Sequence, residues 1–202
     1  GFEAHSSLTP LGVNAVEIAC EFVAHLKSMH RELVQSGPFD PIYDVPHTTV
    51  HTGVIAGGTA LNIIPRQCEV TWEIRHHHMN TPEDLFARAK AFGEGLVPAM
   101  QAVAPDTGIS HELKSVLPGF ATAADSEIAQ LCFDCADVDP ASGAGKVSFG
   151  TEAALFHQAG VPTIVCGPGH IAQAHQPNEF VAISEMQKGV EVFARFLNTL
   201  RG

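Results

Sequence analysis

The stretch Glu-Val-Thr-Trp-Glu-Ile-Arg, residues 69–75, alternates polar and apolar residues without exception. Successive side chains of a β-strand point to opposite faces, so Val70, Trp72 and Ile74 share one face and Arg75 lies on the other. This pattern predicts a strand with one face on a hydrophobic core. The opposite, polar face is expected to remain open.

The segments around this strand predict a mixed α/β domain. Residues 12–35 have apolar positions at helical spacing, and Thr81-Pro82 is a good start for a second helix. The further elements expected are strands at 2–7, 48–55 and 109–116, with the second helix running to about residue 103. The order β-α-β-β-α-β predicts a ferredoxin-like domain over residues 1–117.

The second half, residues 118–202, has a different pattern. Helices and two short apolar strands alternate, with strands expected at 146–149 and 162–166 and helices at 125–135, 152–159 and 184–200. Two parallel strands cannot cover both faces of a sheet or protect its edges. We therefore expect this half to be an incomplete segment of a larger α/β domain. The first residues begin within a pattern, which suggests a piece of a longer chain.

The bulk composition limits the classes of partner. The 202 residues carry a formal charge of −11, from 22 acidic and 11 basic residues, with no basic cluster. Nucleic acids and anionic membranes are therefore unlikely partners, and no apolar run reaches the roughly 20 residues of a membrane span. Five cysteines without a disulfide-like spacing favour a reducing cytoplasm.

The loop after residues 162–166 has the composition of a ligand site. Gly167-Pro168-Gly169 ends the apolar run, and His170, His175 and Glu179 follow. Ligands of open α/β sheets bind at the carboxyl ends of strands, and a neutral imidazole can bind zinc. One histidine cannot form a metal site alone. The tract 76–78, His-His-His, is expected to lie on the surface. Cys132-x-x-Cys135 lacks a second cysteine pair, so no zinc site is predicted there.

Four motifs in the right order make the chain resemble the M20 metallopeptidase/deacylase family. Two are similar to its lid, or dimerisation, domain: Gly-x-x-Ala-His-Ser-Ser from residue 1, and Gly-Gly-Thr-Ala-x-Asn-Ile-Ile-Pro at 57–65. Two are similar to the last third of its catalytic domain: Gly-Thr-Glu-Ala at 150–153, and residues 167–179.

The resemblance implies specific roles. The family hydrolyses amide bonds with two zinc or cobalt ions, and His175 matches a ligand of one of them. His5 matches a lid histidine that reaches the partner subunit's site across a homodimer. Asn62 and Arg75 match residues that hold the substrate carboxylate, and Gly150-Thr151 matches a loop contacting the same substrate. Local alternatives remain: His5 capping its own turn, Asn62 forming an Asx turn, and Arg75 pairing on the sheet.

The implied reaction is hydrolysis of N-acetylornithine to ornithine and acetate, a step of arginine biosynthesis. In the family, the other metal ligands and the general base precede the lid, so we expect at most one ligand here and an inactive chain. The alternatives are another M20 amidohydrolase (succinyl-diaminopimelate desuccinylase, aminoacylase or carboxypeptidase), or a ferredoxin-like binding or dimerisation module without chemistry of its own.

Overall fold

The computed structural model describes residues 1–142 and 144–201. They form two compact units: unit 1 comprises Gly1–Val116 with Val147–Phe149, and unit 2 comprises Leu117–Lys146 with Gly150–Gly202. That these units correspond to the predicted lid and catalytic segments stays a prediction. Within the described part of the chain, no helix is both long enough and apolar enough to span a membrane.

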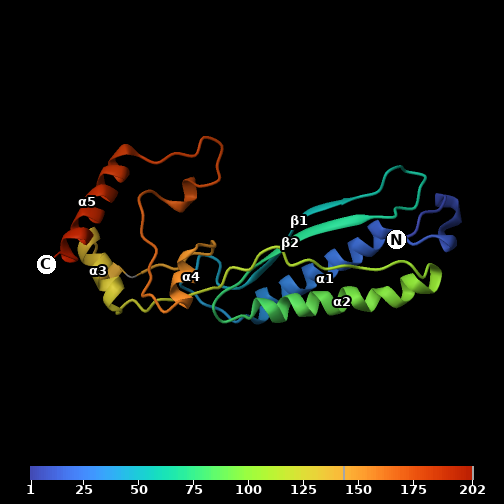
Figure 1. Cartoon of the computed structure of the whole chain (residues 1–202), viewed down its shortest axis with the longest axis horizontal. Helices are drawn as coiled ribbons and strands as arrows, with labels where there is room; N and C mark the ends of the chain where they lie inside the picture. Colours follow the sequence, from blue (N-terminus) through green and yellow to red (C-terminus); the bar gives the residue numbers. More distant parts are fainter. Residues whose placement is uncertain (143, 202) are drawn as a thin grey trace. The chain divides into compact units, whose positions relative to one another are not determined.

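Unit 1 is built on an antiparallel β-hairpin (Figure 1). Strand β1, Thr49–Gly57, pairs with β2, Cys68–Arg75, in a register that runs from Thr49 opposite Arg75 to Gly57 opposite Cys68. The register shifts once, between Thr52 and Val54. Exposure alternates along β2 as its sequence predicted, with the apolar positions half-buried and the polar ones exposed.

Two long helices cover the apolar face of the hairpin: α1, Ala15–Ser36, and α2, Pro82–Val103. Asn14 caps α1, because its Oδ1 accepts hydrogen bonds from the N–H groups of Val16 and Glu17. The core that joins the layers consists of Phe22, Leu26, Met29, Leu33, Val50, Leu85 and Ala89, with Val70, Trp72, Ile74 and Phe92 packed against it. Its burial of apolar area is the main stabilisation of unit 1.

The predicted α/β fold class is confirmed, but the sheet of the described structure has two strands instead of four. The amino-terminal segment makes single bridges, from Phe2 to Val13 and from His5 to Ile63, before a 3-10 helix, Ser6–Leu11. Residues 109–116 return as an extended segment without strand pairing (Figure 1). Its His111 ring packs against Phe22 of α1 and Phe86 of α2, so this segment is held by side chains.

Gly93, inside α2, makes this packing possible. A Cβ atom at Gly93 would lie 2.7 Å from Nε2 of His111. Such a contact is too short for any other residue at this position without a shift of the ring. Gly93 therefore serves as a close-contact position in a continuous helix.

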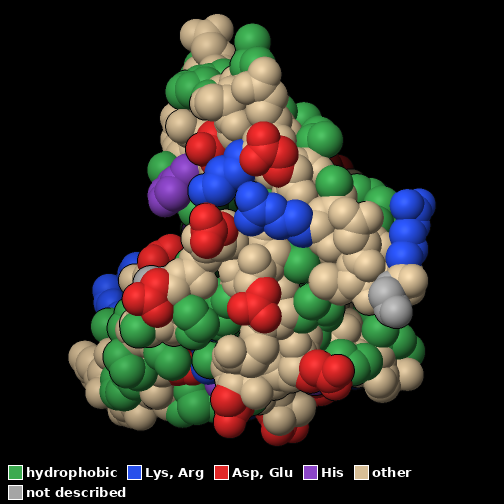
Figure 2. Space-filling view, turned by 90° about the vertical axis from the view of Figure 1, so that its left-hand side faces the viewer, with side chains coloured by type: hydrophobic (Ala, Val, Ile, Leu, Met, Phe, Trp, Pro, Cys, Tyr) green, Lys and Arg blue, Asp and Glu red, His purple; other side chains and the backbone are tan. Residues whose placement is uncertain are grey.

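Unit 2 is more open. Its helices are α3, Glu127–Ala136, α4, Ala153–Gln158, and α5, Ile183–Thr199. Neither segment predicted as a strand, 146–149 or 162–166, forms part of the sheet, and residues 148–149 form a bend. A strand needs a hydrogen-bonded neighbouring strand, and the sheet of the described residues contains only β1 and β2. Apolar side chains consequently reach the surface, among them Ile183, Met186, Val190 and Phe193 of α5. Figure 2 shows hydrophobic side chains exposed on one side of the molecule.

The interpretation of His76, His77 and His78 as surface residues was wrong for His77. Its ring stacks on Tyr43 at a centroid distance of 3.9 Å, and the residue is only 3% exposed. Its backbone N–H donates to Oγ1 of Thr48, 3.1 Å away. His77 follows the end of β2 at Arg75, and its burial does not continue the alternation of the strand, whose inward positions are Val70, Trp72 and Ile74. Burial lowers the pKa of His77 below its ordinary value of 6.5.

Candidate functional site

His5 has a fixed imidazole at the amino-terminal end of unit 1. Its Nδ1 accepts a hydrogen bond from the backbone N–H of Ser7 at 3.2 Å and lies 2.8 Å from the Ser7 hydroxyl. Because a backbone N–H can only donate, Nδ1 carries no proton in this arrangement, and the neutral ring must carry it on Nε2. The exposed His5 thus presents an N–H donor. His5 also caps its own turn, as the alternative from the sequence had it, because it is the residue before the 3-10 helix Ser6–Leu11.

Asn62 lies beside His5, in the connection between β1 and β2. Its carbonyl oxygen accepts a hydrogen bond from the N–H of Ser6 at 3.1 Å, and the N–H of Ile64 donates to the carbonyl of Ala4 at 2.8 Å. Gly12 approaches the same turn so closely that a Cβ there would lie 2.6 Å from Ile64. The amino-terminal segment and the hairpin turn therefore form one backbone-bonded platform with His5 and Asn62 on it.

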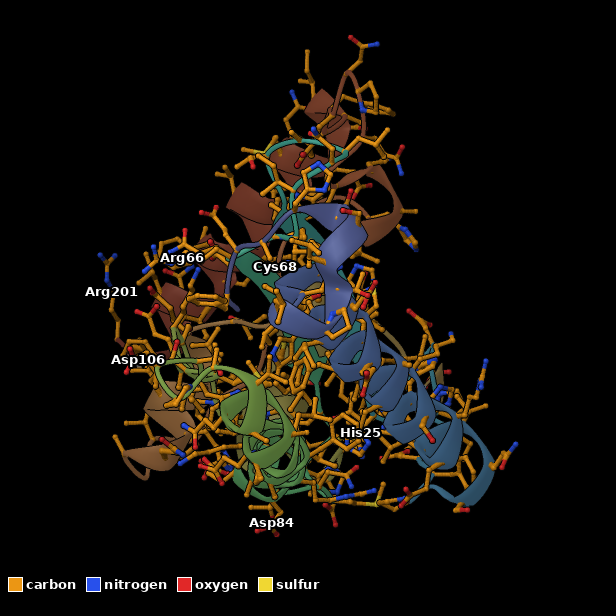
Figure 3. All side chains as sticks on the ribbon, turned by 90° about the vertical axis from the view of Figure 1, so that its right-hand side faces the viewer. His25, Arg66, Cys68, Asp84, Asp106 and Arg201 are labelled. Carbon is orange, nitrogen blue, oxygen red and sulfur yellow. The ribbon has the colours of Figure 1, made fainter. Side chains whose placement is uncertain are left out.

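Arg75 lies at the opposite end of the ladder from this platform. Arg75 ends β2 opposite Thr49, whereas Cys68 begins β2 near the hairpin turn. Cys68 is labelled in Figure 3. Eight strand residues separate the two ends by about 23 Å. The Arg75 guanidinium forms an ion pair with Glu73 at 2.8 Å on the open face of the sheet, and both side chains are about half exposed. Arg75 thus pairs with Glu73 of its own strand, and not across the sheet as the alternative had it.

His175 lies in unit 2, in the loop between the 3-10 helix Ile171–Gln173 and α5. Its φ of 58° is in the left-handed region, as is that of Asn178 at 62°. The N–H of His175 donates to a carboxylate oxygen of Glu179 at 2.9 Å, which closes the loop on itself. The imidazole is exposed, while His170 caps the 3-10 helix by accepting from the N–H of Ala172.

Gly150 and Thr151 lie directly before α4 in unit 2. The Thr151 Oγ1 accepts a hydrogen bond from the N–H of Ala153 at 3.3 Å, so it satisfies one of the free donors at the helix start. Gly150 is exposed and Thr151 is half-buried.

Of the residues predicted for the site, only His5 and Asn62 lie together, while Arg75 lies apart from them. His175 and Thr151 each make local contacts within unit 2.

A metal site is not formed by the described residues, among which no group of three histidine, cysteine or acidic side chains could hold an ion. Zinc requires three or four protein ligands, so His175 could be only one member of a set. The residues present therefore do not by themselves fit the two ions that the family resemblance implies.

Comparison with known proteins bears on this arrangement. Residues 1–96 match the family model described as the peptidase dimerisation domain, M20 dimer. The amino-terminal part of the chain thus resembles the M20 family. The match covers the β1–β2 hairpin, the platform of His5 and Asn62, and Arg75. The resemblance predicted from the sequence motifs is thereby confirmed.

Acetylornithine deacetylases are among the relatives of this chain. That of Photorhabdus laumondii is 34% identical over 186 residues, which cover 91% of this chain and 45% of the relative. That of Myxococcus xanthus is 31% identical over 202 residues, which cover 96% of this chain and 49% of the relative. The chain thus spans about half the length of these relatives.

Solved structures support the fold. An aminopeptidase, PepT, from Bacillus cereus has a TM-score of 0.63 at 22% identity. The match covers 100% of this chain and 49% of the aminopeptidase chain. An M20 metallo-carboxypeptidase from Sulfolobus solfataricus has a TM-score of 0.62 at 15% identity, with coverages of 98% and 55%. At these identities the likeness concerns the fold alone.

Two supporting residues were not identified from the sequence. Ser7 fixes the His5 ring, and Glu179 holds the backbone of His175. A serine two positions after a histidine and an acid four positions after one are weak signals, because many loops contain both. The hydrogen bonds only become evident once the backbone between the partners is known.

Proposed function

We propose that this chain supplies the lid and the carboxyl-terminal catalytic segment of a metal-dependent amidohydrolase that releases acetate from N-acetylornithine. The observation that carries the proposal is the His5–Asn62 platform, built by backbone hydrogen bonds inside the M20 dimerisation domain. The names of the relatives support the acetylated substrate. The product ornithine would then place the complete protein in arginine biosynthesis, in the cytoplasm.

His5 is the proposed catalytic residue of this chain. Hydrolysis of an amide places negative charge on the carbonyl oxygen as water attacks, and a donor aimed at that oxygen stabilises the transition state. With Nδ1 accepting from Ser7, the His5 Nε2–H is available for this hydrogen bond. The ring needs no change of tautomer when the substrate arrives, so its donor is preorganised.

Arg75 and Asn62 are the proposed carboxylate-binding residues, with Gly150 and Thr151 as further substrate contacts. A guanidinium binds a carboxylate with two parallel hydrogen bonds, which orients as well as attracts the substrate. Arg75 already pairs with one carboxylate, that of Glu73, and its side chain is half exposed, so its guanidinium group is accessible to a substrate carboxylate. The substrate carboxylate would replace Glu73 in that pair.

The separation of these residues supports a homodimer. About 23 Å of strand lies between the two ends of β2, which is longer than an amino-acid substrate. One substrate therefore cannot contact His5 and Arg75 of the same chain. In a two-fold dimer through the lid, His5 and Asn62 of one chain would serve the site that contains Arg75 of the other.

The metal would be zinc or cobalt, held mostly by residues outside this chain. His175 is the one ligand proposed here, and its loop geometry leaves the ring exposed for that role. When bound, such ions supply an activated water and polarise the amide carbonyl.

The test begins with metal content and acetylornithine turnover of this chain supplied with zinc or cobalt. Neither tight metal nor turnover is expected. Turnover with stoichiometric metal would overturn the view that the remaining ligands come from elsewhere. The complete protein should hydrolyse acetylornithine faster than succinyl-diaminopimelate, and the reverse order would favour another M20 amidohydrolase.

Subunit exchange tests the shared site in the complete protein. His5→Ala and Arg75→Ala dimers should each be nearly inactive, whereas an equal mixture should recover about a quarter of wild-type activity, because half the dimers are mixed and each has one intact site. Recovery near zero, with exchange proven by tagged subunits, would place both residues in one chain's site.

A non-catalytic dimerisation module is the second candidate, favoured by the lack of a three-ligand metal cluster among the described residues. It predicts that this chain dimerises by itself and that the complete protein binds acetylornithine no better than ornithine. Calorimetry with both compounds separates the two proposals.

A further inference from the structure

The ion pair between Glu73 and Arg75 presents an anion and a cation side by side on the open face of the sheet. Both residues belong to β2, two positions apart, so their side chains lie on the same face. Oε2 of Glu73 lies 2.8 Å from Nη2 of Arg75, and the two side chains are 47% and 50% exposed. A small molecule from solution can therefore reach both charges.

We propose that Glu73 selects substrates whose side chain ends in a cation. The inference rests on the proposed function, in which Arg75 binds the substrate carboxylate. That carboxylate takes the place of Glu73 on the guanidinium and leaves Glu73 as an unpaired anion beside a second anion. An ammonium group on the same substrate removes the repulsion, because it pairs with Glu73. Substrates without a cation do not compensate the displaced carboxylate.

The pair can exchange its partners because it is exposed. Water competes for both charges of such a pair, so the pair contributes little to the stability of a fold. About half of each side chain meets solvent in the free protein. Separating Arg75 from Glu73 is therefore easy, whereas leaving Glu73 next to the substrate carboxylate is unfavourable, since like charges repel. The difference between substrates then depends on what Glu73 meets after the exchange.

The spacing of the two residues suits a diamino acid. Neighbours on one face of a strand have Cα atoms about 7 Å apart. In N-acetylornithine, five bonds of about 1.5 Å join the carboxylate carbon to the side-chain nitrogen, so these atoms lie roughly 6 Å apart in an extended chain. A carboxylate on Arg75 thus leaves the ammonium within reach of the flexible Glu73 side chain. The acetylated nitrogen branches from the carbon between these groups and stays free for hydrolysis.

The remaining titratable residues on this face do not offer the same anion. Glu69 is the other acidic residue of β2, and its carboxylate oxygen lies 3.6 Å from Nζ of Lys114. Six strand positions, about 20 Å, separate Glu69 from Arg75, which is too far for one amino-acid substrate. His51 lies opposite Glu73 in the ladder, and a histidine carries no negative charge. Glu73 is therefore the acid of β2 that can act together with Arg75.

A purely structural role of Glu73 predicts a different pattern. If Glu73 only oriented Arg75, removal of its charge would weaken the binding of every substrate carboxylate. In the proposed role, Glu73 competes with the carboxylate of a substrate that lacks a cation, and it assists a substrate that carries one. Removal of its charge therefore changes the two substrates in opposite directions.

Steady-state kinetics of the complete protein with two substrates tests this difference. N-acetylnorleucine has the shape of N-acetylornithine, with a methyl group in place of the ammonium. Because kcat/KM compares the free substrates with their transition states, its ratio for the two compounds measures the selection. Glu73→Gln should lower kcat/KM for N-acetylornithine by about fivefold, the upper range for one exposed ion pair, and should raise it for N-acetylnorleucine. Glu73→Asp should retain the preference for N-acetylornithine.

Glu69→Gln is the matched control, because it removes an acid of the same strand that pairs with Lys114 instead of Arg75. The ratio of the two kcat/KM values should not change in this variant, and circular dichroism verifies the folding of each variant. Three results would overturn the inference alone: changes of equal direction in Glu73→Gln, a ratio that also shifts in Glu69→Gln, or equal kcat/KM values in the unaltered protein. Hydrolysis of neither substrate by the complete protein would overturn the proposed function as well.

Discussion

Asn62 accepts a backbone hydrogen bond from the residue next to His5, Ser6, at 3.1 Å, so His5 and Asn62 lie on one platform although the chain separates them by α1 and β1. The platform is rigid because backbone groups form it. Two candidate functional side chains thus keep a fixed spacing, which a substrate-binding or oxyanion-binding role requires.

The first prediction concerns His5 in the complete protein. His5→Ala should lower kcat for acetylornithine by about 10²-fold, because one donor to the developing oxyanion is lost. Ser7→Ala should have a smaller effect, because the Ser7 backbone N–H still orients the ring. Steady-state kinetics with sedimentation to verify the dimer measures both. An unchanged kcat for His5→Ala would leave His5 with its capping role alone.

The second prediction concerns the core of unit 1. Leu26 is 1% exposed between the helices and the hairpin. Leu26→Ala should lower the free energy of unfolding by about 3 kcal/mol, from lost burial and the cavity left behind. Leu61→Ala is the matched control, since Leu61 is fully exposed in the hairpin connection. Urea titrations that gave equal effects for the two variants would contradict this core assignment.

The third prediction concerns the start of α1. The Asn14 side chain accepts two backbone hydrogen bonds, whereas Thr81, at the same position of α2, makes no side-chain capping bond in the described structure. Asn14→Ala should lower the unfolding free energy by about 1 kcal/mol. Thr81→Ala should lower the free energy of unfolding by clearly less than Asn14→Ala. Chemical denaturation of both variants measures the difference, and a larger cost at Thr81 would contradict the capping geometry.

The fourth prediction concerns acid stability and His25. Its ring stacks on Phe92 at 4.0 Å, and its buried Nε2 has no hydrogen-bond partner among the described residues. Burial, and then the nearby Arg88, lowers the pKa of His25 below its ordinary value of 6.5. Below pH 6.5 the unfolded chain therefore binds more protons at this residue than the folded chain. The free energy of unfolding should fall as the pH decreases from 6.5.

A substitution isolates this contribution. His25→Phe keeps the stacked ring and removes the titration, so its unfolding free energy should fall less between pH 7.5 and pH 5 than that of the unaltered chain. His51→Gln, at an exposed position of β1, should leave the decrease unchanged. Urea titrations at both pH values provide the comparison. An equal decrease in His25→Phe would assign the acid sensitivity to other groups.

Much of unit 1 could be predicted from local sequence. The alternation of 69–75 predicted the faces of β2, and the apolar spacing of 12–35 predicted α1, because a buried face imposes its period on the residues that form it. The extended segments at 109–116, 146–149 and 162–166 could not be assigned in this way. An apolar run predicts extension, whereas hydrogen bonding in a sheet depends on a neighbour.

The sequence by itself determined the family resemblance and the types of the candidate residues, because the motifs around His5, Asn62, Arg75 and His175 are short and contiguous. The tertiary structure decided which of them meet. It joined His5 to Asn62, separated both from Arg75 and buried His77. Contacts between distant segments depend on the packing of whole elements, and no local pattern carries that information.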